Sequence, residues 1–591
     1  MIRKPTSVRF KTRAERFHVR EGVTIEIEVQ LEGGAVASGR AIEVSRSGAQ
    51  CVVTEGAGGL EVGARVDRLD FHVELVELEI RGAVVRRLEP INVGGLPTGL
   101  VVASFAFDEA AELLPAELKP FLAHSAYVTG ELLTRTATDG FPQVNALEHT
   151  LFDFYRKDSR DLFEKCNAFY EMVKDMQRRK MYQCLYRVTV TSGLDHRISV
   201  FNPIRRTEEQ FLCFDSNSYL GLHRHPRVVE AVHAALDKVG YGTPSAQVLS
   251  GTNRYLRELE DALSRFHGRQ DTMIFPSGYA ANLGAITALV RANDLVVRDR
   301  FSHASIHDAV RASGSRFQRV VAHDDMEALD VALTKGAANE SVKGKLVATD
   351  GVFSMHGLRA NLPALVAIAR HHGAKLLVDE AHATGVLGKT GRGLEEHYGM
   401  PGTIDVLVGT FSKVPGTTGG YVCGSRKMIE YLRFYANPGM FTASLPAAQC
   451  AGVLEAYRLI DEEPQHRERL WRNTEVLAEG LRSAGFLLPE EIQSPILTVL
   501  LGSSALMFVF SRDLFMHGIK CGSVAYPAVP VGEAILRIAV NARHTDDDLE
   551  RAVEIFTQLG ARYGVLGKPR EELLAIGDRI AADLADEGRP A

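Results

Sequence analysis

The sequence lacks the features of several large protein classes. Its 591 residues include seven cysteines but no CxxC pair, which argues against both a disulfide framework and a zinc site. No apolar run approaches the length that spans a membrane, and residues 1–5 lack the apolar core of a signal peptide. The formal net charge of −6 gives no reason to expect a nucleic-acid partner. With 45% hydrophobic residues, the composition favours a cytoplasmic enzyme with large cores.

The length predicts more than one domain, and the character of the sequence changes along the chain. Neither a low-complexity linker nor an internal repeat marks the boundaries. From the motifs described below we expect a small β-barrel in 1–122, a helical connector and the start of the catalytic unit in 123–210, a major domain in 211–450, a small domain in 451–565 and a polar helical tail in 566–591.

The most informative segment is 376–385 (LLVDEAHATG), an apolar run that ends in Asp379, with His382 three residues later. Such a run predicts a buried strand with an acid and an imidazole at its carboxyl end, where open α/β sheets bind ligands. Lys413 follows a second strand-like run, 405–408. Pyridoxal phosphate (PLP) requires a lysine for a Schiff base and an acid that keeps its pyridine nitrogen protonated. We assign these roles to Lys413 and Asp379.

The ordinary alternative is a surface lysine and a strand-end aspartate that caps a helix. Other segments favour the cofactor site. Residues 277–282 (SGYAAN) open an apolar helix, whose free N–H groups suit a phosphate. His303 and Ser354 each come shortly after a strand-like run, 294–297 and 345–348, so both are expected at the same sheet edge. A lone histidine is more often structural, but four strand ends that converge on one cofactor favour a functional site.

Residues from about 217 to about 559 resemble the α-oxoamine synthases, fold-type I PLP enzymes that join an amino acid to an acyl thioester with loss of carbon dioxide. Within that family the resemblance is strongest to bacterial serine palmitoyltransferases, through 409–413 (GTFSK), 441–446 (FTASLP) and 467–471 (RERLW). It implies an α/β fold with a mixed, mostly parallel sheet in the major domain and a small α+β C-terminal domain. It also implies a homodimer with shared active sites.

The resemblance assigns a role to each matching residue. It implies that Lys413 forms the Schiff base and then acts as the base on the α-carbon, that Asp379 pairs with the pyridine nitrogen, and that His303 stacks on the ring. His382 and Ser354 are expected near the phenolic oxygen. The expected phosphate contacts are Ser277, Gly278, Tyr279 and Thr410, with Thr442 and Ser444 reaching the phosphate of the neighbouring subunit.

The substrate carboxylate is expected to bind Asn217 and Arg537. A planar guanidinium suits bidentate capture of a carboxylate. The alternative for Arg537 is a surface ion pair, but its apolar flanks, 534–536 and 538–540, predict a strand. With serine and a palmitoyl thioester, the implied product is 3-ketosphinganine.

Three positions depart from the pattern of serine palmitoyltransferases. Ala525 and Gln247 stand where an arginine is usual, and His356 begins a segment, 356–359, that replaces a more common acidic version. None is essential for PLP, so the reaction class is retained. The amino acid is best interpreted as serine. The alternative substrate is glycine or alanine, as in 8-amino-7-oxononanoate synthases or 2-amino-3-ketobutyrate ligases. The acyl carrier is either coenzyme A or a carrier protein.

The N-terminal region differs from the rest. Residues 23–29, 78–85 and 99–105 alternate or run as short strands between glycine-rich turns, which predicts a small β-barrel. The region resembles a PilZ domain, a receptor module for cyclic di-GMP. The matching residues are Arg16 and Arg20 before the first strand and Ser45 and Gly48 in the second motif, although Glu43 departs from the family's Asp or Asn. The alternative is a solvated basic face on a domain that only docks.

Two segments have helical patterns. Residues 161–173 are apolar at near-helical spacing and are expected to pack against a domain or a dimer partner. Residues 184–201 are expected to form strands that lead into the catalytic domain. The tail, 571–584, carries four apolar residues on one side, namely Leu573, Leu574, Ile576 and Ile580. It is expected to dock on the body or to contact the inner membrane peripherally.

Two competitors belong to other classes. A catalytically inactive relative that serves as a regulatory subunit would lack the lysine, so the presence of Lys413 and Asp379 counts against it. The other competitor is a cyclic di-GMP receptor that signals through partner binding. Nucleotide binding without a spectral PLP band would favour this alternative.

Overall fold

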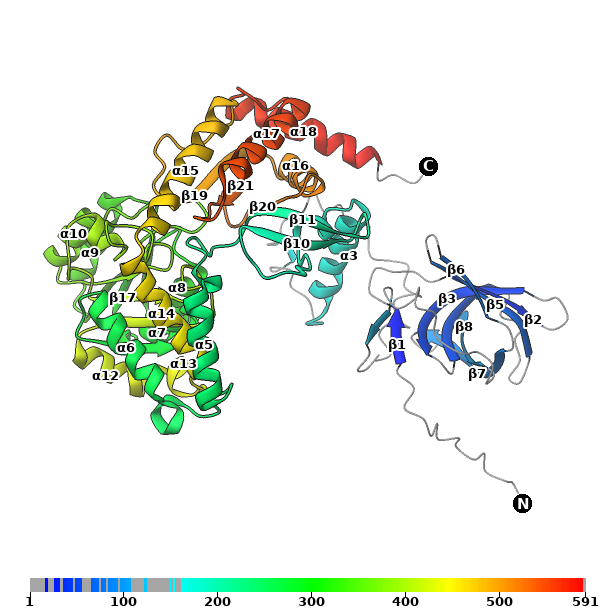
Figure 1. Cartoon of the computed structure of the whole chain (residues 1–591), viewed down its shortest axis with the longest axis horizontal. Coiled ribbons are helices and arrows are strands. Elements are labelled where there is room, and N and C mark those ends of the chain that lie inside the picture. Colours follow the sequence, from blue (N-terminus) through cyan, green and yellow to red (C-terminus); the bar gives the residue numbers. More distant parts are fainter. Residues whose placement is uncertain are drawn as a thin grey trace, which may run out of the picture. The chain divides into compact units, whose positions relative to one another are not determined.

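We describe a computed structural model of the chain (Figure 1). It describes residues 161–587, residues 149, 153 and 154, and the backbone pairing of the strands β1 to β9 between residues 16 and 124. The chain divides into two compact units. One comprises residues 1–144 and 161–177, and the other comprises residues 145–160 and 178–591.

The first unit contains a sheet of nine strands and the helix α3 (Glu164–Arg178), which covers most of the helix expected over 161–173. The strands are β1 (Arg16–Val19), β2 (Glu26–Leu31), β3 (Val36–Ser45), β4 (Gly48–Glu55), β5 (Arg65–Val73), β6 (Val76–Ile80), β7 (Ala83–Val93), β8 (Leu96–Phe107) and β9 (Leu122–His124). Because β2 pairs with both β5 and β3, the order β2-β5-β7-β8-β4-β3 closes on itself. The likeness to a PilZ domain stays a prediction.

Three of the residues expected to bind cyclic di-GMP are neighbours in the strand register. Arg16 on β1 is paired with Ser45 on β3, and Ser45 is paired with Gly48 on β4. The fourth, Arg20, lies outside the described residues.

The second unit is built on a seven-stranded sheet of order β12-β18-β17-β16-β15-β13-β14. Its strands are β12 (Asp271–Phe275), β13 (Leu295–Asp299), β14 (Phe317–Val321), β15 (Lys345–Asp350), β16 (Lys375–Asp379), β17 (Val406–Thr410) and β18 (Gly420–Gly424). Only β18 runs antiparallel to its neighbours. The central strands are almost wholly buried because helices cover both faces, as expected for a parallel sheet.

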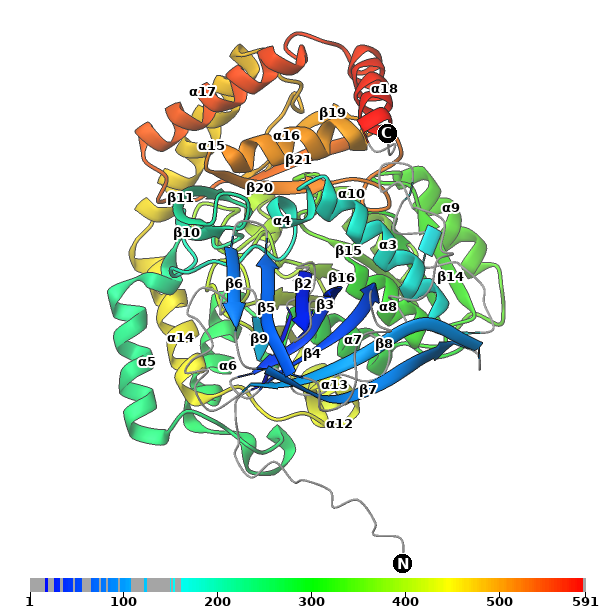
Figure 2. The ribbon, with the colours of Figure 1, turned by 90° about the vertical axis from the view of Figure 1, so that its right-hand side faces the viewer.

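Helices connect and cover these strands. They are α5 (Pro226–Val239), α6 (Arg254–Phe266), α7 (Gly278–Leu289), α8 (Ala304–Ala312), α9 (Met326–Ala337), α10 (Leu362–His371), α11 (Leu394–His397), α12 (Arg426–Tyr435), α13 (Asn437–Met440), α14 (Ala447–Glu462) and α15 (Gln465–Ser483), with the short turns η3 (Leu222–Arg224) and η4 (Gln247–Gly251). Helices α5 and α14 lie side by side in both views (Figures 1 and 2).

The carboxyl ends of the parallel strands gather the polar residues that the sequence singled out. Asp379 ends β16, and its partner in the register of β15 is Asp350. Ser277 caps α7 by accepting a hydrogen bond from the Ala280 N–H, and His303 caps α8 by accepting one from the Ser305 N–H. Strand ends and helix starts therefore meet at one edge of the sheet, as the apolar runs predicted.

A smaller sheet combines distant segments in the order β10-β11-β20-β21-β19. Its strands are β10 (Arg197–Asn202), β11 (Thr207–Phe214), β19 (Ile496–Gly502), β20 (Ile519–Val524) and β21 (Ala534–Ala539). Strands β10 and β11 thus join the sheet of the small domain, across the boundary expected near residue 210. The expectation of strands over 184–201 is confirmed only from Arg197, where β10 begins, apart from an isolated bridge at Val190. It is wrong at Cys184, which lies in α4 (Tyr182–Leu185) and packs against Ile198 and Phe515.

The helices α16 (Ser504–Met516), α17 (Asp546–Tyr563) and α18 (Arg570–Glu587) complete the small domain, and Figure 2 shows them with α15 above its sheet. The tail helix α18 docks on the body. Leu573 and Ile576 are buried, and Gly577 allows a close approach to Ser503, because a Cβ at Gly577 would lie 2.0 Å from the Ser503 Cβ. Among the described residues, no helix has the length and apolar character needed to cross a membrane.

The docking of α18 predicts a stability effect. Leu573→Ala removes a side chain that is 1% exposed, so we expect it to cost about 2–5 kcal/mol. Thermal unfolding and limited proteolysis of the C-terminus measure the effect. Asp578→Ala, on an exposed position of the same helix, should change stability by less than about 0.5 kcal/mol. If Leu573→Ala left stability unchanged but weakened binding to lipid vesicles, the apolar side of α18 would contact a membrane instead of docking on the body.

Candidate active site

A cavity of about 290 Å³ lies at the carboxyl edge of the large sheet. Eight of the residues proposed from the sequence line it, namely Ser277, Gly278, Tyr279, His303, Asp379, His382, Thr410 and Lys413. Five others do not line it in this chain: Asn217, Ser354, Thr442, Ser444 and Arg537. The cavity is near the lower end of the size range of small-molecule sites.

Lys413 and the acids at the strand ends form the electrostatic centre of the cavity. Burial lowers the pKa of Lys413, and the nearby Arg537 lowers it further, while Asp379 opposes both. Burial raises the pKa of Asp379, but the Asn282 side chain, His303 and the Ala381 N–H favour its charged form. Burial and the charge of Asp379 raise the pKa of Asp350 well above its usual value. The pKa values of both carboxyls are thus raised, and that of Asp379 is raised less strongly because it has donors and a nearby lysine that favour its charged form.

His303 is held on both its backbone and its side chain. Its backbone N–H donates to Asp350 Oδ1 over 3.1 Å, and its Nδ1 lies 2.7 Å from Ser305 Oγ. Behind the cavity, Asn282 Nδ2 donates to Asp379 Oδ2 over 2.6 Å and to Ser305 Oγ over 2.9 Å. These contacts fix the orientation of both the acid and the imidazole.

His382 has a buried partner that sequence reasoning left without a role. The hydroxyl of Tyr219 lies 2.6 Å from His382 Nδ1, and Tyr219 is fully buried. Burial raises the pKa of Tyr219 to about 12, so the phenol keeps its proton. Burial, together with the charge of Lys413, lowers the pKa of His382 well below its usual value. A protonated phenol beside a neutral imidazole is suited to donate to Nδ1, which leaves the Nε2 hydrogen on the other side of the ring.

Arg537 and Asn217, expected to bind the substrate carboxylate, contact each other directly. Arg537 lies on β21 and is 8% exposed, which excludes the surface ion pair. One of its Nη atoms donates to Asn217 Oδ1 over 2.9 Å, and its Nε donates to the carbonyl oxygen of Ser354. Ser354 thus contacts Arg537 through its backbone, and Val352, two residues earlier, lines the cavity.

The other end of the cavity fits a phosphate. It is formed by the start of α7, where free N–H groups and the helix dipole favour an anion. Gly278 permits this approach, because a Cβ there would lie 2.9 Å from the Thr410 Cβ. Thr410 Oγ1 donates to the Gly419 carbonyl over 3.0 Å, which orients its side chain. A lysine, a buried carboxylate and an anion-binding helix start around one cavity fit the functional groups of PLP.

Thr442 and Ser444 lie outside this cavity, on a strand-like segment beside η4. Ala443 bridges to Ala246, and the Ser444 N–H donates to the Ser245 carbonyl over 2.9 Å. Ser444 Oγ is buried and has no hydrogen-bond partner among the described residues. The role expected for both side chains, in the site of a neighbouring subunit, stays a prediction.

The three departures from the family pattern also lie outside the cavity lining. Gln247 in η4 donates to the Ile274 carbonyl over 2.7 Å. Ala525 follows Val524, which packs with Val529, Ile535 and Met355. His356 stacks on Phe301 with ring centroids 4.0 Å apart, and burial lowers its pKa to about 4.

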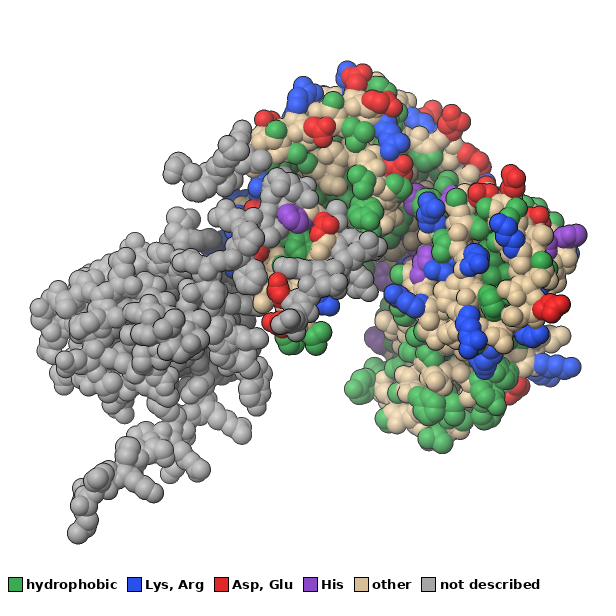
Figure 3. Space-filling model, turned by 180° about the vertical axis from the view of Figure 1, so that it is seen from behind, with side chains coloured by type: hydrophobic (Ala, Val, Ile, Leu, Met, Phe, Trp, Pro, Cys, Tyr) green, Lys and Arg blue, Asp and Glu red, His purple; other side chains and the backbone are tan. Residues whose placement is uncertain are grey.

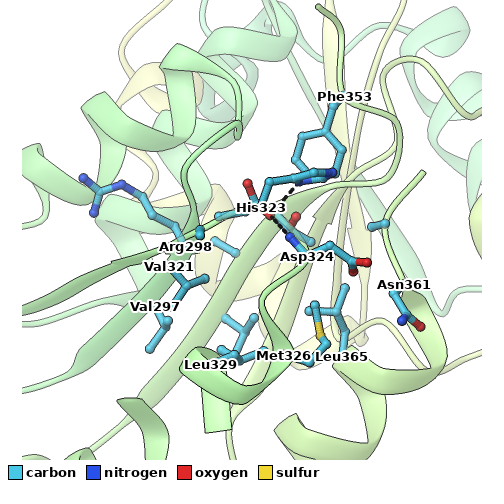
Figure 4. Close-up of a pocket in the computed structure, with 16 residues that line it drawn as sticks. Val297, Arg298, Val321, His323, Asp324, Met326, Leu329, Phe353, Asn361 and Leu365 are labelled. Carbon is cyan, nitrogen blue, oxygen red and sulfur yellow. Dashed lines mark hydrogen bonds and ion pairs between the residues drawn. The ribbon is translucent and has the colours of Figure 1, made fainter. Parts of the chain in front are cut away.

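A second, smaller cavity lies beneath β13, β14 and β15 (Figure 4). His323 and Phe353 lie at one side of it, and Met326, Leu329 and Leu365 lie at the other. His323 is bound by Asp299 over 3.0 Å. With a volume of about 20 Å³, this cavity has room for little more than one water molecule.

A cluster of His225, Glu463 and His466 has ligand atoms close enough for a metal ion. Its surroundings favour an ion-pair network instead. His225 Nδ1 accepts the Arg227 N–H, and His466 Nδ1 lies 2.9 Å from an Arg469 Nη, which can only donate. Both rings then carry hydrogen on Nε2, the atom that faces Glu463, whereas metal-bound histidines need that lone pair.

Sequence reasoning missed four residues around the main cavity: Tyr219, Asn282, Ser305 and Asp350. Asp350 carried a usable signal, since it ends a buried strand just as Asp379 does. Asn282 ends the segment 277–282, and Tyr219 and Ser305 each lie two residues after a residue that was singled out, but their contacts join different segments of the chain. Tyr219 and His382, for example, are 163 residues apart.

Comparison with known proteins identifies the family of the chain. The family model "Aminotransferase class I and II" matches residues 209–556. The chain is 36% identical over 380 residues to an 8-amino-7-oxononanoate synthase of Bacillus velezensis, which is 64% of this chain and 94% of that protein. The chain belongs to the aminotransferase class I and II family.

Its relatives include two more specific kinds of enzyme. The chain is 38% identical over 445 residues to 4-hydroxy-2,2'-bipyrrole-5-methanol synthase PigH of a Serratia species, covering 75% of this chain and 67% of that one. The solved structure of a serine palmitoyltransferase of Sphingomonas wittichii matches with a TM-score of 0.64 and 33% identity, over 69% of this chain and 100% of that chain. A serine palmitoyltransferase of S. paucimobilis, with a bound PLP–myriocin aldimine, matches with a TM-score of 0.63, 33% identity and the same coverage.

Glu380, next to Asp379, is fully buried and has an unusual charge state. Burial raises its pKa to about 8. The Leu394 N–H, which donates to both of its carboxylate oxygens, opposes this rise but does not cancel it. Between the usual value of 4.5 and about 8, the folded chain holds a proton that the unfolded chain has released. In this window stability falls as pH rises, by up to about 1.4 kcal/mol per pH unit.

We expect Glu380→Gln to remove this pH dependence while an amide oxygen still accepts the Leu394 N–H. Measured by urea unfolding from about pH 5 to about pH 8, the variant should gain stability relative to the wild type as pH rises. Glu395→Gln is the control, because Glu395 is paired with Arg269 over 2.7 Å and its neutralisation should destabilise by about 3–5 kcal/mol at neutral pH. A difference between Glu380→Gln and the wild type that stays constant with pH would contradict the assignment.

Proposed function

We propose that this protein is a PLP-dependent α-oxoamine synthase, which condenses a small amino acid with a long-chain acyl thioester and releases carbon dioxide. The observation that carries the proposal is the convergence of Lys413, Asp379 and His303 on one cavity, beside an anion-binding helix start. The serine palmitoyltransferases and 8-amino-7-oxononanoate synthase among its relatives support this reaction class. The cofactor is pyridoxal phosphate.

Each residue of the site has its own role in the proposed reaction. When bound, PLP supplies the electron sink for a carbanion at the α-carbon of the amino acid. Asp379 holds the pyridine nitrogen in its protonated form, and the start of α7 with Thr410 binds the phosphate. The Lys413 amine, with its pKa lowered by burial, is the base that takes the α-proton. Arg537, oriented by Asn217, holds the carboxylate, and His303 faces the ring.

For the substrates we propose serine and a palmitoyl thioester, with 3-ketosphinganine as the product. The structural likeness to serine palmitoyltransferases supports this choice. Glycine or alanine, with another acyl group, is the runner-up, because the relatives also include 8-amino-7-oxononanoate synthases and Ala525 lacks a second guanidinium. Either acyl carrier, coenzyme A or a carrier protein, is compatible with the described residues.

We also propose that the enzyme is a homodimer in which Thr442 and Ser444 complete the site of the partner. An exposed apolar patch next to these residues supports an interface, with Leu249 at 76% and Phe441 at 77% exposure. A groove of about 230 Å³ beside it is lined by Gln247, Val248, Phe434 and Met440, among others. Hydrophobic side chains gather at this end of the unit in Figure 3. The buried, unpartnered Ser444 Oγ is consistent with a site completed by association.

Regulation by cyclic di-GMP is a further part of the proposal. The strand register that aligns Arg16, Ser45 and Gly48 supports it. A nucleotide effect on catalysis would distinguish a regulated enzyme from one whose N-terminal unit only docks.

We expect Lys413→Ala to abolish the visible absorbance of the lysine–PLP Schiff base and all product formation. Lys427→Ala, an exposed lysine on α12, should leave both unchanged. The product test is mass spectrometry of the wild type with PLP, palmitoyl-coenzyme A and serine, alanine or glycine in turn, with and without cyclic di-GMP. A 3-ketosphinganine signal from serine alone supports the proposal. Absence of any product from these substrates would exclude palmitoyl-coenzyme A as the donor.

The shared-site proposal predicts complementation. Lys413→Ala and the double variant Thr442→Ala/Ser444→Ala are each expected to be impaired, because each subunit lacks one part of a site. Co-expressed heterodimers should regain activity, since one of their two sites combines Lys413 with an intact Thr442 and Ser444. Lys413→Ala mixed with His303→Ala is the control without recovery, because both residues line the cavity of the same chain. Equal behaviour of the two mixtures would contradict a shared site.

A further inference from the structure

Two buried side chains connect Asp379 to His303 behind the cavity. Asn282 on α7 and Ser305 on α8 are both fully buried, and neither lines the cavity. Asn282 Nδ2 lies 2.6 Å from Asp379 Oδ2 and 2.9 Å from Ser305 Oγ, and Ser305 Oγ lies 2.7 Å from His303 Nδ1. The chain of contacts therefore runs without a break from the acid to the imidazole.

The direction of each hydrogen bond is determined by chemistry. The Asp379 carboxylate can only accept, so Asn282 must present its Nδ2 there rather than its Oδ1. The second Nδ2 hydrogen points to Ser305 Oγ, which accepts it. The hydroxyl hydrogen of Ser305 is then available for His303 Nδ1, the remaining partner within reach.

The backbone of α8 adds an independent constraint. The Ser305 N–H lies 3.3 Å from His303 Nδ1, as the N-cap contact of the helix. A backbone N–H can only donate, so two donors converge on Nδ1 and this atom is the acceptor. The hydrogen of the neutral ring must then be on Nε2. The His303 N–H, bound to Asp350 Oδ1, fixes the backbone from which the ring extends.

We propose that Asn282 and Ser305 form one positioning pair, which orients the Asp379 carboxylate and holds His303 in the tautomer with its hydrogen on Nε2. Neither residue touches the cofactor, so both act through the residues that do. The inference rests on the proposed cofactor roles of Asp379 and His303, and is independent of which amino acid or acyl group reacts. A pair that acts as one unit makes the two cofactor contacts depend on each other.

A double-mutant cycle on PLP binding tests this coupling. The PLP dissociation constant is measured by fluorescence titration of the apoenzyme for the wild type, Asn282→Ala, Ser305→Ala and the double variant. We expect losses of about 10–100-fold for Asn282→Ala and about 3–10-fold for Ser305→Ala, as for hydrogen bonds to charged and neutral groups. The double variant should bind within about 3-fold of Asn282→Ala alone, because residues in one network are not additive. Losses that multiply would overturn the proposal.

Matched variants separate positioning from simple stability. Ser264 is also buried, and its Oγ donates to the Glu260 carbonyl over 2.8 Å, away from the cavity. Ser264→Ala should lower stability about as much as Ser305→Ala does but leave PLP affinity within about 2-fold. Ser305→Thr retains the hydroxyl and should restore most of the affinity lost in Ser305→Ala. Equal affinities for Ser305→Ala and the wild type would count decisively against the pair.

A second measurement needs neither PLP nor turnover. In apoenzyme labelled with ¹⁵N-histidine, the His303 signals, assigned with His303→Gln, should show hydrogen on Nε2 in the wild type. In Ser305→Ala only the longer contact from the backbone N–H remains, so we expect the share of the tautomer with hydrogen on Nδ1 to increase. This result would stand even if no amino acid reacted, so failure of the proposed reaction and failure of the positioning pair are distinguishable. An unchanged tautomer in Ser305→Ala would refute the role of the Ser305 hydroxyl. This test does not need Asn282→Ala, so it remains available if that variant does not fold.

Discussion

The burial of the Asp379 carboxyl is the constraint on which the arrangement of the site depends. A carboxylate removed from water is costly unless donors and opposite charges surround it. Asp379 receives Asn282 Nδ2 and the Ala381 N–H and has Lys413 and His303 nearby. Burial raises the pKa values of all three adjacent acids, Asp350, Asp379 and Glu380, and Asp379 has the most contacts that oppose this rise. Three acids crowded at neighbouring strand ends thus differ in how well their surroundings accommodate a charge.

The architecture of the cofactor sheet could be predicted from the sequence in some detail. Runs such as 376–378 and 346–348 are apolar throughout, which marks strands buried on both faces, and the acids and histidines that follow them must meet at one edge. Ser277 was identifiable as a helix start and is an N-cap in the structure, whereas His303, expected only after a strand, also proves to be an N-cap. Arg537 was recognisable as a strand residue because its flanks are apolar, and β21 places it in the interior.

What could not be predicted depends on contacts between distant segments. The pairing of β11 with β20 joins residues about three hundred positions apart, and no local pattern specifies it. Arg537 meets Asn217 across 320 residues, so their mutual contact was not visible even though both had been singled out. At Cys184, apolar residues suited to a strand form a short helix because they pack against α16 and β10. Local propensity yields to tertiary packing in such short segments.

The composition of the smaller sheet has a mechanical consequence. Strands β10 and β11 are the first strands of the second unit, and β11 pairs with β20, which pairs with β21. The chain that enters from the N-terminal side is therefore anchored to the sheet that carries Arg537, rather than to the sheet that carries Asp379. A displacement of β10 and β11 would therefore reach Arg537, the residue proposed to hold the substrate carboxylate, through one set of hydrogen-bonded strands, whereas the strand that carries Asp379 belongs to the other sheet.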